Sequence, residues 1–369
     1  MSRRVSQAAE DPRADNTRRV AAFRDLAAQK QIRAFLVSAQ ANIRYLTGFT
    51  GSSGYLLITP ERSVLYTDGR YDTQAHEQTS GIEIAVSRSS PLLRLEKDIR
   101  KERFRSLAFE GNRISFEQYQ HLDSLRDLRL KPVTGLVERL RAVKTAAEIE
   151  SIRRSVILNS RAFERACHRA QARWTETQLA AEIEYQMRHL GAEKAAFDTI
   201  VASGPQAALP HASPRAKSLV HNSLIVIDQG AILDGYTSDM TRMACMGSLP
   251  SRERQWVRAV LEAQQAAIGK VKAGVKAATV DRAARQVLQR FGLEQAFKHS
   301  TGHGLGLEIH EAPRIGPREE QRLLAGMVIT IEPGVYIEGA GGVRIEDVVV
   351  VTRSGCDVLT PTSRRLRSL

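Results

Sequence analysis

Acidic residues stand at the points where short apolar segments end in the second half of this 369-residue chain. Leu224–Ile227 has the composition of a buried strand and is followed at once by Asp228, and Met327–Ile331 is followed by Glu332. A single acid at a strand end is usually a turn former. Strands, however, fix the direction of the side chains that they carry, so these segments predict a sheet whose strand ends present carboxylates.

Two predicted hairpins each bring a pair of acids together. Asp228 and Asp239 are 11 residues apart, and the strong turn signal Asp234-Gly235 lies between them. Glu332 and Glu346 are 14 residues apart across a Pro-Gly turn. An antiparallel hairpin can bring two such side chains to one face. Carboxylates that close stay ionised only when a cation lies between them, and four of them would be neutralised by two divalent cations.

A histidine adds a nitrogen ligand to this oxygen-rich set. His303 lies in Thr301–Gly306, whose glycines let the backbone approach closely. Such a set suits Mn, Co, Fe or Zn and does not choose among them. Taken singly, Glu332 would be a loop residue, and Arg344 with Glu346 a surface ion pair. The combination favours a metal site, with these predicted ligands: Asp228, Asp239, His303, Glu332 and Glu346.

Three further residues are candidates for contacts with a substrate. His211 lies in the rigid polar loop Leu209–Pro214, and His310 follows His303 by seven residues. The glycines between the two histidines argue against a helix, so the pair is not the helical HExxH zinc motif. Tyr336 follows shortly after the Pro-Gly turn, and its context is equally consistent with a place in the functional site and with a place in the hydrophobic core. Three other histidines have no such context and are expected to be ordinary core or surface residues: His189, His221 and His299.

At these residues the chain resembles the pita-bread metallopeptidases, the family of Xaa-Pro aminopeptidases, prolidases and methionine aminopeptidases. The segments that carry the resemblance are Ile227–Gly230, Gly235–Arg242, Gly302–Gly306, Thr330–Gly334 and Val343–Asp347. The resemblance covers residues 139–363. Asn42–Phe49 and Thr67–Tyr71 are similar to motifs of the creatinase/prolidase N-terminal domain, which the simplest methionine aminopeptidases lack.

The resemblance implies how the ligands divide between two metal ions. Asp228 would chelate one ion, and His303 and Glu332 would hold the other. Asp239 and Glu346 would bridge both ions.

The resemblance also implies roles around the ions. Glu332 would take the proton from a water that bridges them. His211 and His310 would bind the carbonyl oxygen of the scissile bond and stabilise the tetrahedral intermediate. Arg344 would orient a ligand carboxylate from behind the metal ligands. Tyr336 is grouped with Arg344, as a residue that either contacts the substrate or supports the ligands.

We expect an α+β fold of two domains. A polar tail would cover residues 1–17, and a small α/β domain of the creatinase/prolidase N-terminal type would cover 18–138. A pita-bread metallopeptidase domain would cover 139–369, with a curved antiparallel sheet flanked by helices. The boundary falls in the charged, helical stretch Glu138–Arg154, where the composition changes.

Composition excludes several classes of protein. Hydrophobic residues make up 42% of the chain and charged residues 26%, as in globular proteins. No apolar run approaches the ~20 residues of a membrane helix, and the arginine-containing N-terminus lacks the apolar segment of a secretory signal. Three scattered cysteines favour a reducing, cytoplasmic location. The net charge of +13 is spread along the chain with few aromatics, so we expect neither nucleic acid nor a membrane as partner.

The expected activity is hydrolysis of the bond between an N-terminal residue and proline by a metal-bridging hydroxide. Two divalent ions are the expected cofactors, with manganese first and Co, Zn or Fe as alternatives. The leading hypothesis is an Xaa-Pro aminopeptidase, and the alternative is an Xaa-Pro dipeptidase (prolidase). A creatinase-like amidinohydrolase and a non-catalytic binding module on the same fold are also possible, although the complete ligand set counts against both. The resemblance further implies a homodimer and a peptide or dipeptide substrate with proline in second position.

Overall fold

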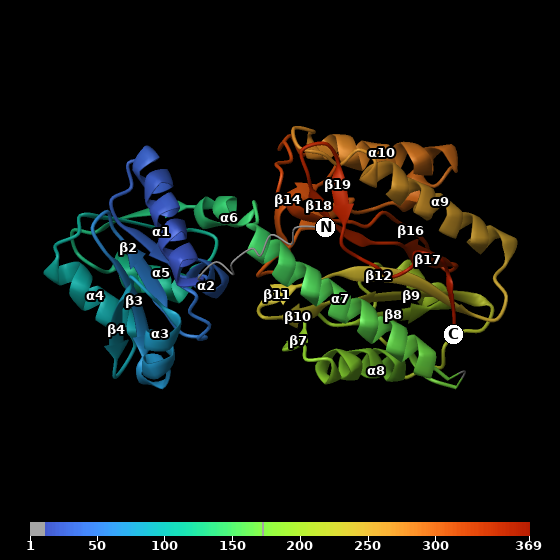
Figure 1. Ribbon diagram of the computed structural model, residues 1–369, viewed down its shortest axis with the longest axis horizontal. Helices are drawn as coiled ribbons and strands as arrows, with labels where there is room; N and C mark the ends of the chain where they lie inside the picture. Colours follow the sequence, from blue (N-terminus) through green and yellow to red (C-terminus); the bar gives the residue numbers. More distant parts are fainter. Residues whose placement is uncertain (1–11, 172) are drawn as a thin grey trace, which may run out of the picture. The chain divides into compact units, whose positions relative to one another are not determined.

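The chain divides into two compact units. The computed structural model describes residues 12–171 and 173–369, and the division falls between Arg141 and Ala142 (Figure 1). This is three residues after the boundary predicted at residue 138. Each unit has its own apolar core. Among the described helices, none combines the length and the apolar composition needed to cross a membrane.

The first unit is built on a six-stranded sheet in the order β4-β3-β2-β1-β5-β6. The β1–β2 and β2–β3 pairs are antiparallel, and the other pairs are parallel. The strands are β1 (Phe35–Val37), β2 (Tyr55–Ile58), β3 (Ser63–Asp68), β4 (Glu83–Ser87), β5 (Ser106–Glu110) and β6 (Arg129–Val133). The helices are α1 (Pro12–Gln29), α2 (Gln40–Thr47), α3 (Asp72–Gln78), α4 (Pro91–Lys101), α5 (Phe116–Asp123) and α6 (Leu136–Arg141). Leu36, Leu57 and Leu95 lie in its core.

The predicted N-terminal tail is partly helical. Residues 1–11 of that tail lie outside the described residues, but residues 12–17 form the first turns of α1. Asp15 pairs with Arg19 one turn later, at 2.6 Å, which supports the start of the helix. Asn16 is buried. The polar composition of residues 12–17 did not indicate a helix, but these residues belong to α1, which is part of the first unit.

The stretch that we expected to be one helix around the boundary is two helices. α6 ends at Arg141, and α7 (Ala146–Arg169) begins after a short break. Thr145 Oγ1 accepts a hydrogen bond from Glu148 N–H, and the Glu148 carboxylate accepts one from Thr145 N–H. This reciprocal capping box starts a new helix, so a single continuous helix was the wrong interpretation.

In the second unit, the strands lie between two pairs of helices (Figure 1). The helices are α7, α8 (Glu176–His189), α9 (Ser251–Ile268) and α10 (Ala277–Arg290). The strands of the first half are β7 (Lys194–Ala195), β8 (Ile200–Ser203), β9 (Ser223–Gln229), β10 (Ala231–Leu233), β11 (Tyr236–Thr237) and β12 (Met240–Met246). The strands of the second half are β13 (Gly302–Gly304), β14 (Glu311–Ile315), β15 (Val328–Ile331), β16 (Gly334–Ile337), β17 (Gly341–Arg344), β18 (Asp347–Val351), β19 (Cys356–Val358) and β20 (Arg367–Ser368).

Two sheets of this unit carry the predicted ligands, one ordered β20-β12-β9-β8 and the other β14-β13-β15-β18-β19. Strand β9 is buried on both faces. Leu224 and Val226 contribute to the core that includes α9 and α10, whereas Ile225 and Ile227 contribute to the core that includes α7 and α8. Burial on both faces explains why the segment before Asp228 is a continuous apolar run rather than an alternating one.

The predicted Asp234-Gly235 turn is confirmed. It joins β10 to β11, which pair antiparallel. Asp234 has φ +51° and Gly235 has φ +76°. Two successive residues with positive φ are typical of the tight hairpin turns that match the twist of the strands.

Candidate metal centre

Asp228 and Asp239 come from neighbouring antiparallel strands. β9 pairs with β12 so that Asp228 lies opposite Thr241. The segment Tyr236–Met246 has the composition of one strand, but it breaks at Ser238, whose hydroxyl accepts a hydrogen bond from Ala231 N–H at 3.0 Å. The break places Asp239 directly before β12. Both aspartates are buried.

Glu332, Glu346 and His303 come from the second sheet. β15 pairs antiparallel with β18 so that Ile331 lies opposite Asp347, which brings the ends that carry Glu332 and Glu346 together. β13, which carries His303, pairs with β15 on its other side. A Cβ on Gly302 would lie 2.0 Å from Thr330 O, so no other residue would allow this approach of the two strands.

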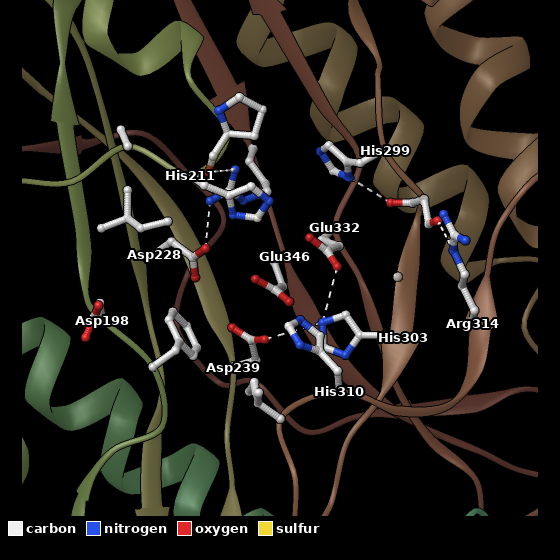
Figure 2. Close-up of a pocket in the computed structure, with 18 of the residues that line it drawn as sticks. Asp198, His211, Asp228, Asp239, His299, His303, His310, Arg314, Glu332 and Glu346 are labelled. Atoms are coloured by element: carbon white, nitrogen blue, oxygen red, sulfur yellow. Dashed lines mark hydrogen bonds and ion pairs between the residues drawn. The ribbon is translucent and has the colours of Figure 1, made fainter. Parts of the chain in front are cut away.

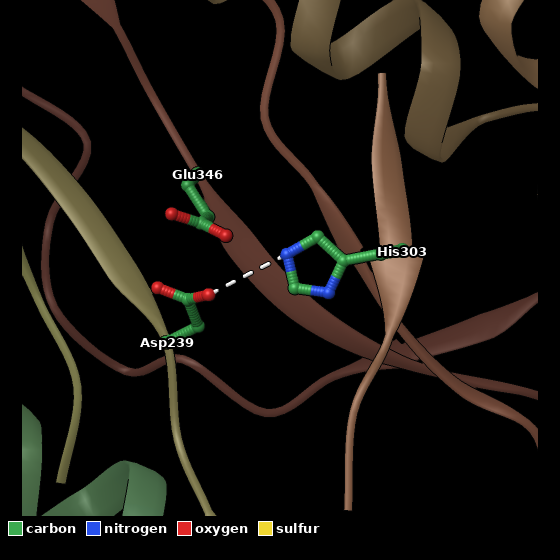
Figure 3. Close-up of side chains that lie close together, drawn as sticks. All are labelled: Asp239, His303 and Glu346. Atoms are coloured by element: carbon green, nitrogen blue, oxygen red, sulfur yellow. Dashed lines mark ion pairs between the residues drawn. The ribbon is translucent and has the colours of Figure 1, made fainter. Parts of the chain in front are cut away.

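The predicted ligands converge on one point from these strands (Figures 2 and 3). His303 Nε2 lies 3.6 Å from Asp239 Oδ2 and 3.4 Å from Glu332 Oε1. One ligand atom each from Asp239, His303 and Glu346 lies within 4.8 Å of the others. These distances are short enough for several side chains to share a cation.

The unsatisfied oxygens of the cluster show that it fits a metal. Three carboxylate oxygens of the cluster are buried and have no hydrogen-bond partner among the described residues: Asp228 Oδ1, Asp239 Oδ1 and Glu346 Oε1. Such atoms are costly unless something binds them. Burial and the neighbouring carboxylates also raise the pKa of Asp239 and of Glu346 well above the ordinary range. Divalent cations would relieve both penalties, and oxygens with one imidazole suit a transition metal.

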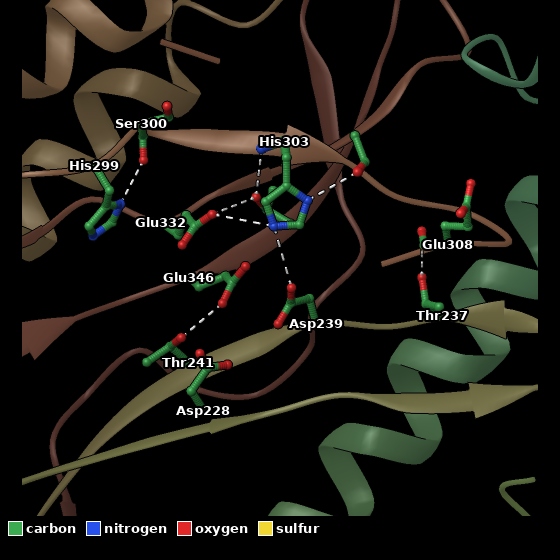
Figure 4. A network of polar contacts seen from close by, with 12 residues as sticks. Asp228, Thr237, Asp239, Thr241, His299, Ser300, His303, Glu308, Glu332 and Glu346 are labelled. Atoms are coloured by element: carbon green, nitrogen blue, oxygen red, sulfur yellow. Dashed lines mark hydrogen bonds and ion pairs between the residues drawn. The ribbon is translucent and has the colours of Figure 1, made fainter. Parts of the chain in front are cut away.

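Arg344 supports the ligands from behind. Its Nη2 donates to Asp228 Oδ2 at 2.6 Å, and its Nε donates to Thr241 Oγ1 at 3.0 Å. The Thr241 hydroxyl in turn donates to Glu346 Oε2 at 2.8 Å (Figure 4). Arg344 therefore orients Asp228 directly and Glu346 through Thr241. Its Nη1 donates to the Tyr336 hydroxyl at 2.6 Å, so Tyr336 is buried behind the ligands.

His299 belongs to the site, although no sequence motif singles it out. Its Nε2 lies 2.8 Å from the Tyr336 hydroxyl, and its Nδ1 lies 2.8 Å from Ser300 O. Burial lowers the pKa of His299 to about 4, so the ring is neutral. Because Arg344 donates to the phenol oxygen, the phenol donates to Nε2 and the Nδ1–H donates to Ser300 O. The available signal was its position four residues before His303.

A cavity of about 640 Å³ opens over the cluster (Figure 2). All five predicted ligands line it, together with His211, His310 and Arg344. The rings of His303 and His310 are 4.4 Å apart between centroids, edge to face. Burial and the adjacent His303 lower the pKa of His310. Tyr336 does not line this cavity, but it accepts a hydrogen bond from Arg344, which does.

The cavity wall also contains charged residues that sequence reasoning missed, because no local pattern connects them to the ligands. Asp198 and Arg314 are both exposed and lie on opposite sides of the labelled cluster (Figure 2). Arg314 Nε donates to Ser300 Oγ at 2.6 Å.

Comparison with known proteins agrees with the fold and the site. Residues 150–353 match metallopeptidase family M24, and residues 19–143 match the Creatinase/Prolidase N-terminal domain. The chain belongs to metallopeptidase family M24. The resemblance drawn from its motifs is thereby confirmed, as are the two-domain α+β architecture and the pita-bread fold of the second unit.

Individual relatives extend over nearly the whole chain. An Xaa-Pro dipeptidase of Pyrococcus horikoshii is 36% identical over 340 residues, which are 92% of this chain and 95% of that protein. The structure of an Xaa-Pro dipeptidase from Bacillus anthracis is 35% identical, with a TM-score of 0.92, over 96% of this chain and 100% of that one. The structure of an X-Pro aminopeptidase from Thermotoga maritima is 36% identical, with a TM-score of 0.86, over 94% of this chain and 100% of that one.

Proposed function

We propose that this chain is a metal-dependent peptidase that cuts the bond between an N-terminal residue and proline, and that dipeptides are its main substrates. The observation that carries the proposal is the convergence of Asp239, His303 and Glu346 around buried carboxylate oxygens that have no hydrogen-bond partner within the described residues. The preference for proline is supported by the relatives, whose names give Xaa-Pro or X-Pro activity.

The chain would hold two divalent ions, of which manganese is the first candidate. Their ligands would be Asp228, Asp239, His303, Glu332 and Glu346. When bound, such ions polarise a carbonyl group and make water acidic enough to react near neutral pH.

Side chains around the ligands would handle the proton and the carbonyl oxygen. Glu332 would accept a proton from the attacking water and pass it to the proline nitrogen that leaves. Its Oε1 is oriented by the Thr330 hydroxyl at 3.3 Å. His211 and His310, on the wall of the same cavity, would donate hydrogen bonds to the developing oxyanion. Each such donor, if well placed, contributes about 3 kcal/mol.

Two observations put dipeptides ahead of the longer peptides expected from the sequence. Two of the three relatives described above are named Xaa-Pro dipeptidases. Arg314 also places a cation on the wall of the cavity that holds the metal ligands. In a dipeptide the C-terminal carboxylate lies one residue beyond the scissile bond, where this guanidinium would bind it.

The second candidate is an Xaa-Pro aminopeptidase that accepts longer peptides. The similarity to the X-Pro aminopeptidase of Thermotoga maritima favours it, because that protein is 36% identical to this chain, as is the Xaa-Pro dipeptidase of Pyrococcus horikoshii. The ligand set serves both activities equally well.

A paired assay distinguishes the candidates. Purified protein would be analysed for bound metal, loaded with Mn²⁺ and offered Gly-Pro and Gly-Pro-Gly. Cleavage of Gly-Pro alone supports the dipeptidase, and cleavage of both supports the aminopeptidase. Glu332→Gln is the matched control and should lose activity by roughly 100-fold or more. If metal-loaded protein cleaved neither peptide, the proposal would be wrong.

A further inference from the structure

An exposed aspartate stands on the wall of the cavity that holds the metal ligands, outside the ligand cluster. Asp198 lines this cavity, and its carboxylate has no hydrogen-bond or ion-pair partner among the described residues. On the same wall, Glu311 and Arg344 are each paired with an opposite charge. Arg314 has no acidic partner in the described part of the chain. The wall therefore offers one anion and one cation that are free to bind a ligand.

The backbone places Asp198 close to the metal ligands. It lies two residues before Ile200, the first residue of β8, and Ile200 lies opposite Asp228 in the sheet. The Ala196 backbone N–H donates to Gly230 O at 2.8 Å, which ties the segment before β8 to the end of β9. Two residues of extended chain span about 7 Å, so Asp198 lies about that much further along the sheet than Asp228.

Arg314 sets the direction in which a dipeptide would lie. If its guanidinium binds the C-terminal carboxylate, the N-terminal residue lies on the opposite side of the metal ligands, which is the side of Asp198 (Figure 2). The α-amino group is attached to the carbon next to the scissile carbonyl, so it stays beside the metal ions, whose positive charge disfavours an ammonium group there. The carboxylate of Asp198 is thus available to a charge further out, on the side chain of the N-terminal residue.

We propose that Asp198 is a specificity-determining residue that binds the cationic side chain of an N-terminal lysine or arginine. The inference rests on the function proposed above and names its preferred substrates, Lys-Pro and Arg-Pro. A lysine side chain spans about 6 Å from Cα to Nζ, which is close to the distance of Asp198 beyond Asp228. Its apolar stem packs on Phe197 and Ile200, which line the same wall.

The expected preference is modest because Asp198 is exposed. An ion pair at an exposed position changes an equilibrium by about fivefold at most. The reference substrate is norleucyl-proline, because norleucine has the four-carbon stem of lysine without the ammonium. With Mn²⁺ at low salt, kcat/KM for Lys-Pro should exceed that for norleucyl-proline by about fivefold, and added salt should bring the ratio towards one.

Variants of two acids test the assignment. Asp198→Asn should bring the ratio of Lys-Pro to norleucyl-proline to about one, because only the lysine substrate loses a partner. Asp198→Lys should make Glu-Pro a better substrate than Gln-Pro. Glu184→Gln and Glu184→Lys are the matched controls, because Glu184 is an exposed acid that lines a depression beside Asp198 but not the cavity itself. These two controls should keep the ratio of the unmodified protein.

The two substrates separate a side-chain subsite from the other roles that Asp198 could have. If Asp198→Asn lowered kcat/KM equally for Lys-Pro and norleucyl-proline, the carboxylate would act on a group that both share, and the proposal would be wrong. The same conclusion would follow if the Glu184 variants changed the ratio as much as the Asp198 variants, since the effect would then come from the net charge around the cavity.

Binding without cleavage provides a second measurement. Metal-free protein in a chelator is titrated with each peptide in a calorimeter, and Lys-Pro should bind about fivefold more tightly than norleucyl-proline. Asp198→Asn should remove this difference. If Mn²⁺-loaded protein cleaved neither peptide but the difference in binding was found, the proposed function would fail and the subsite would stand. Equal affinities, or a preference for Lys-Pro that survived in Asp198→Asn, would overturn the subsite even in a protein that cleaves Gly-Pro.

Discussion

Arg344 holds one oxygen of Asp228 and leaves the other for a cation. The Nη2–Oδ2 distance is 2.6 Å, whereas Oδ1 is buried with no hydrogen-bond partner in the part of the chain that the structure describes. A carboxylate that is fixed at one oxygen is already oriented when a metal ion arrives, so less conformational freedom is lost on binding.

Replacement of Arg344 by methionine should therefore weaken metal binding. The loss of an outer partner of a ligand typically costs roughly 10- to 100-fold in affinity. Arg344→Lys should recover only part of this loss, because one ammonium cannot contact Asp228, Thr241 and Tyr336 together as the guanidinium does. Competition with a fluorescent chelator measures the Mn²⁺ affinity, and circular dichroism checks folding. A folded methionine variant with the affinity of the unmodified protein would contradict the role of Arg344.

Replacement of Thr241 is a smaller change than replacement of Arg344, because it removes no charge. Its hydroxyl accepts from Arg344 and donates to Glu346, so Thr241→Val removes the link between them without adding a charge. We expect a loss of Mn²⁺ affinity of about tenfold. Thr362→Val is the control, because Thr362 is buried and its hydroxyl has no hydrogen-bond partner among the described residues. Equal effects of the two valine variants would show that the Thr241 hydrogen bonds do not orient Glu346.

Two of the predicted ligands, Asp228 and Glu332, were recognisable in the sequence because each follows a strongly apolar run. Asp228 follows the continuous run of β9, and Glu332 follows that of β15, so local pattern alone placed them at strand ends. The supporting contacts were not readable in this way. The Thr241–Glu346 contact spans 105 residues, and the Arg344–Asp228 contact spans 116 residues. Contacts of this kind have no periodic signal, since they arise only after both sheets have packed.

Local pattern also misjudged segments whose conformation depends on hydrogen bonds to distant parts of the chain. Tyr236–Met246 has the composition of one strand, but the contacts of Ser238 with Ala231 break it before Asp239. His299 has no distinguishing neighbours in the sequence, and its place in the site follows from its contact with Tyr336, 37 residues away. The convergence of the predicted ligands could therefore be predicted from the sequence. Of the residues that support them, the resemblance indicated Arg344 and Tyr336, whereas Thr241 and His299 were missed.

Protonation of the buried carboxylates at acidic pH should stabilise the folded state of the metal-free protein. Burial raises the pKa of Glu332 from 4.5 to about 7, so the folded state binds more protons than the unfolded state between these values. Stability from this group is present below about pH 4.5 and is lost as the pH rises towards about 7. Asp239 and Glu346, whose pKa values burial also raises, act in the same direction.

Melting experiments in a chelator measure this effect. The melting temperature of the unmodified protein should fall more steeply from about pH 5 to about pH 8 than that of Glu332→Gln, which lacks the ionisable group. Mn²⁺ should raise the melting temperature of the unmodified protein most at the alkaline end, because protons no longer compete for the ligands. Parallel curves for the two proteins would mean that Glu332 does not titrate as its burial implies.

Arg314 provides the sharpest test of the preference for dipeptides. Its guanidinium lies on the cavity wall, where Ser300 fixes it at 2.6 Å. If it binds the C-terminal carboxylate, Arg314→Met should raise KM for Gly-Pro about tenfold, which corresponds to about 1.4 kcal/mol. KM for glycyl-prolinamide, which has no carboxylate, should not change. Arg318→Met is the control, because Arg318 is an exposed arginine outside the cavity wall. Release of proline or prolinamide is followed by chromatography, and an equal loss for both substrates would show that Arg314 does not recognise the carboxylate.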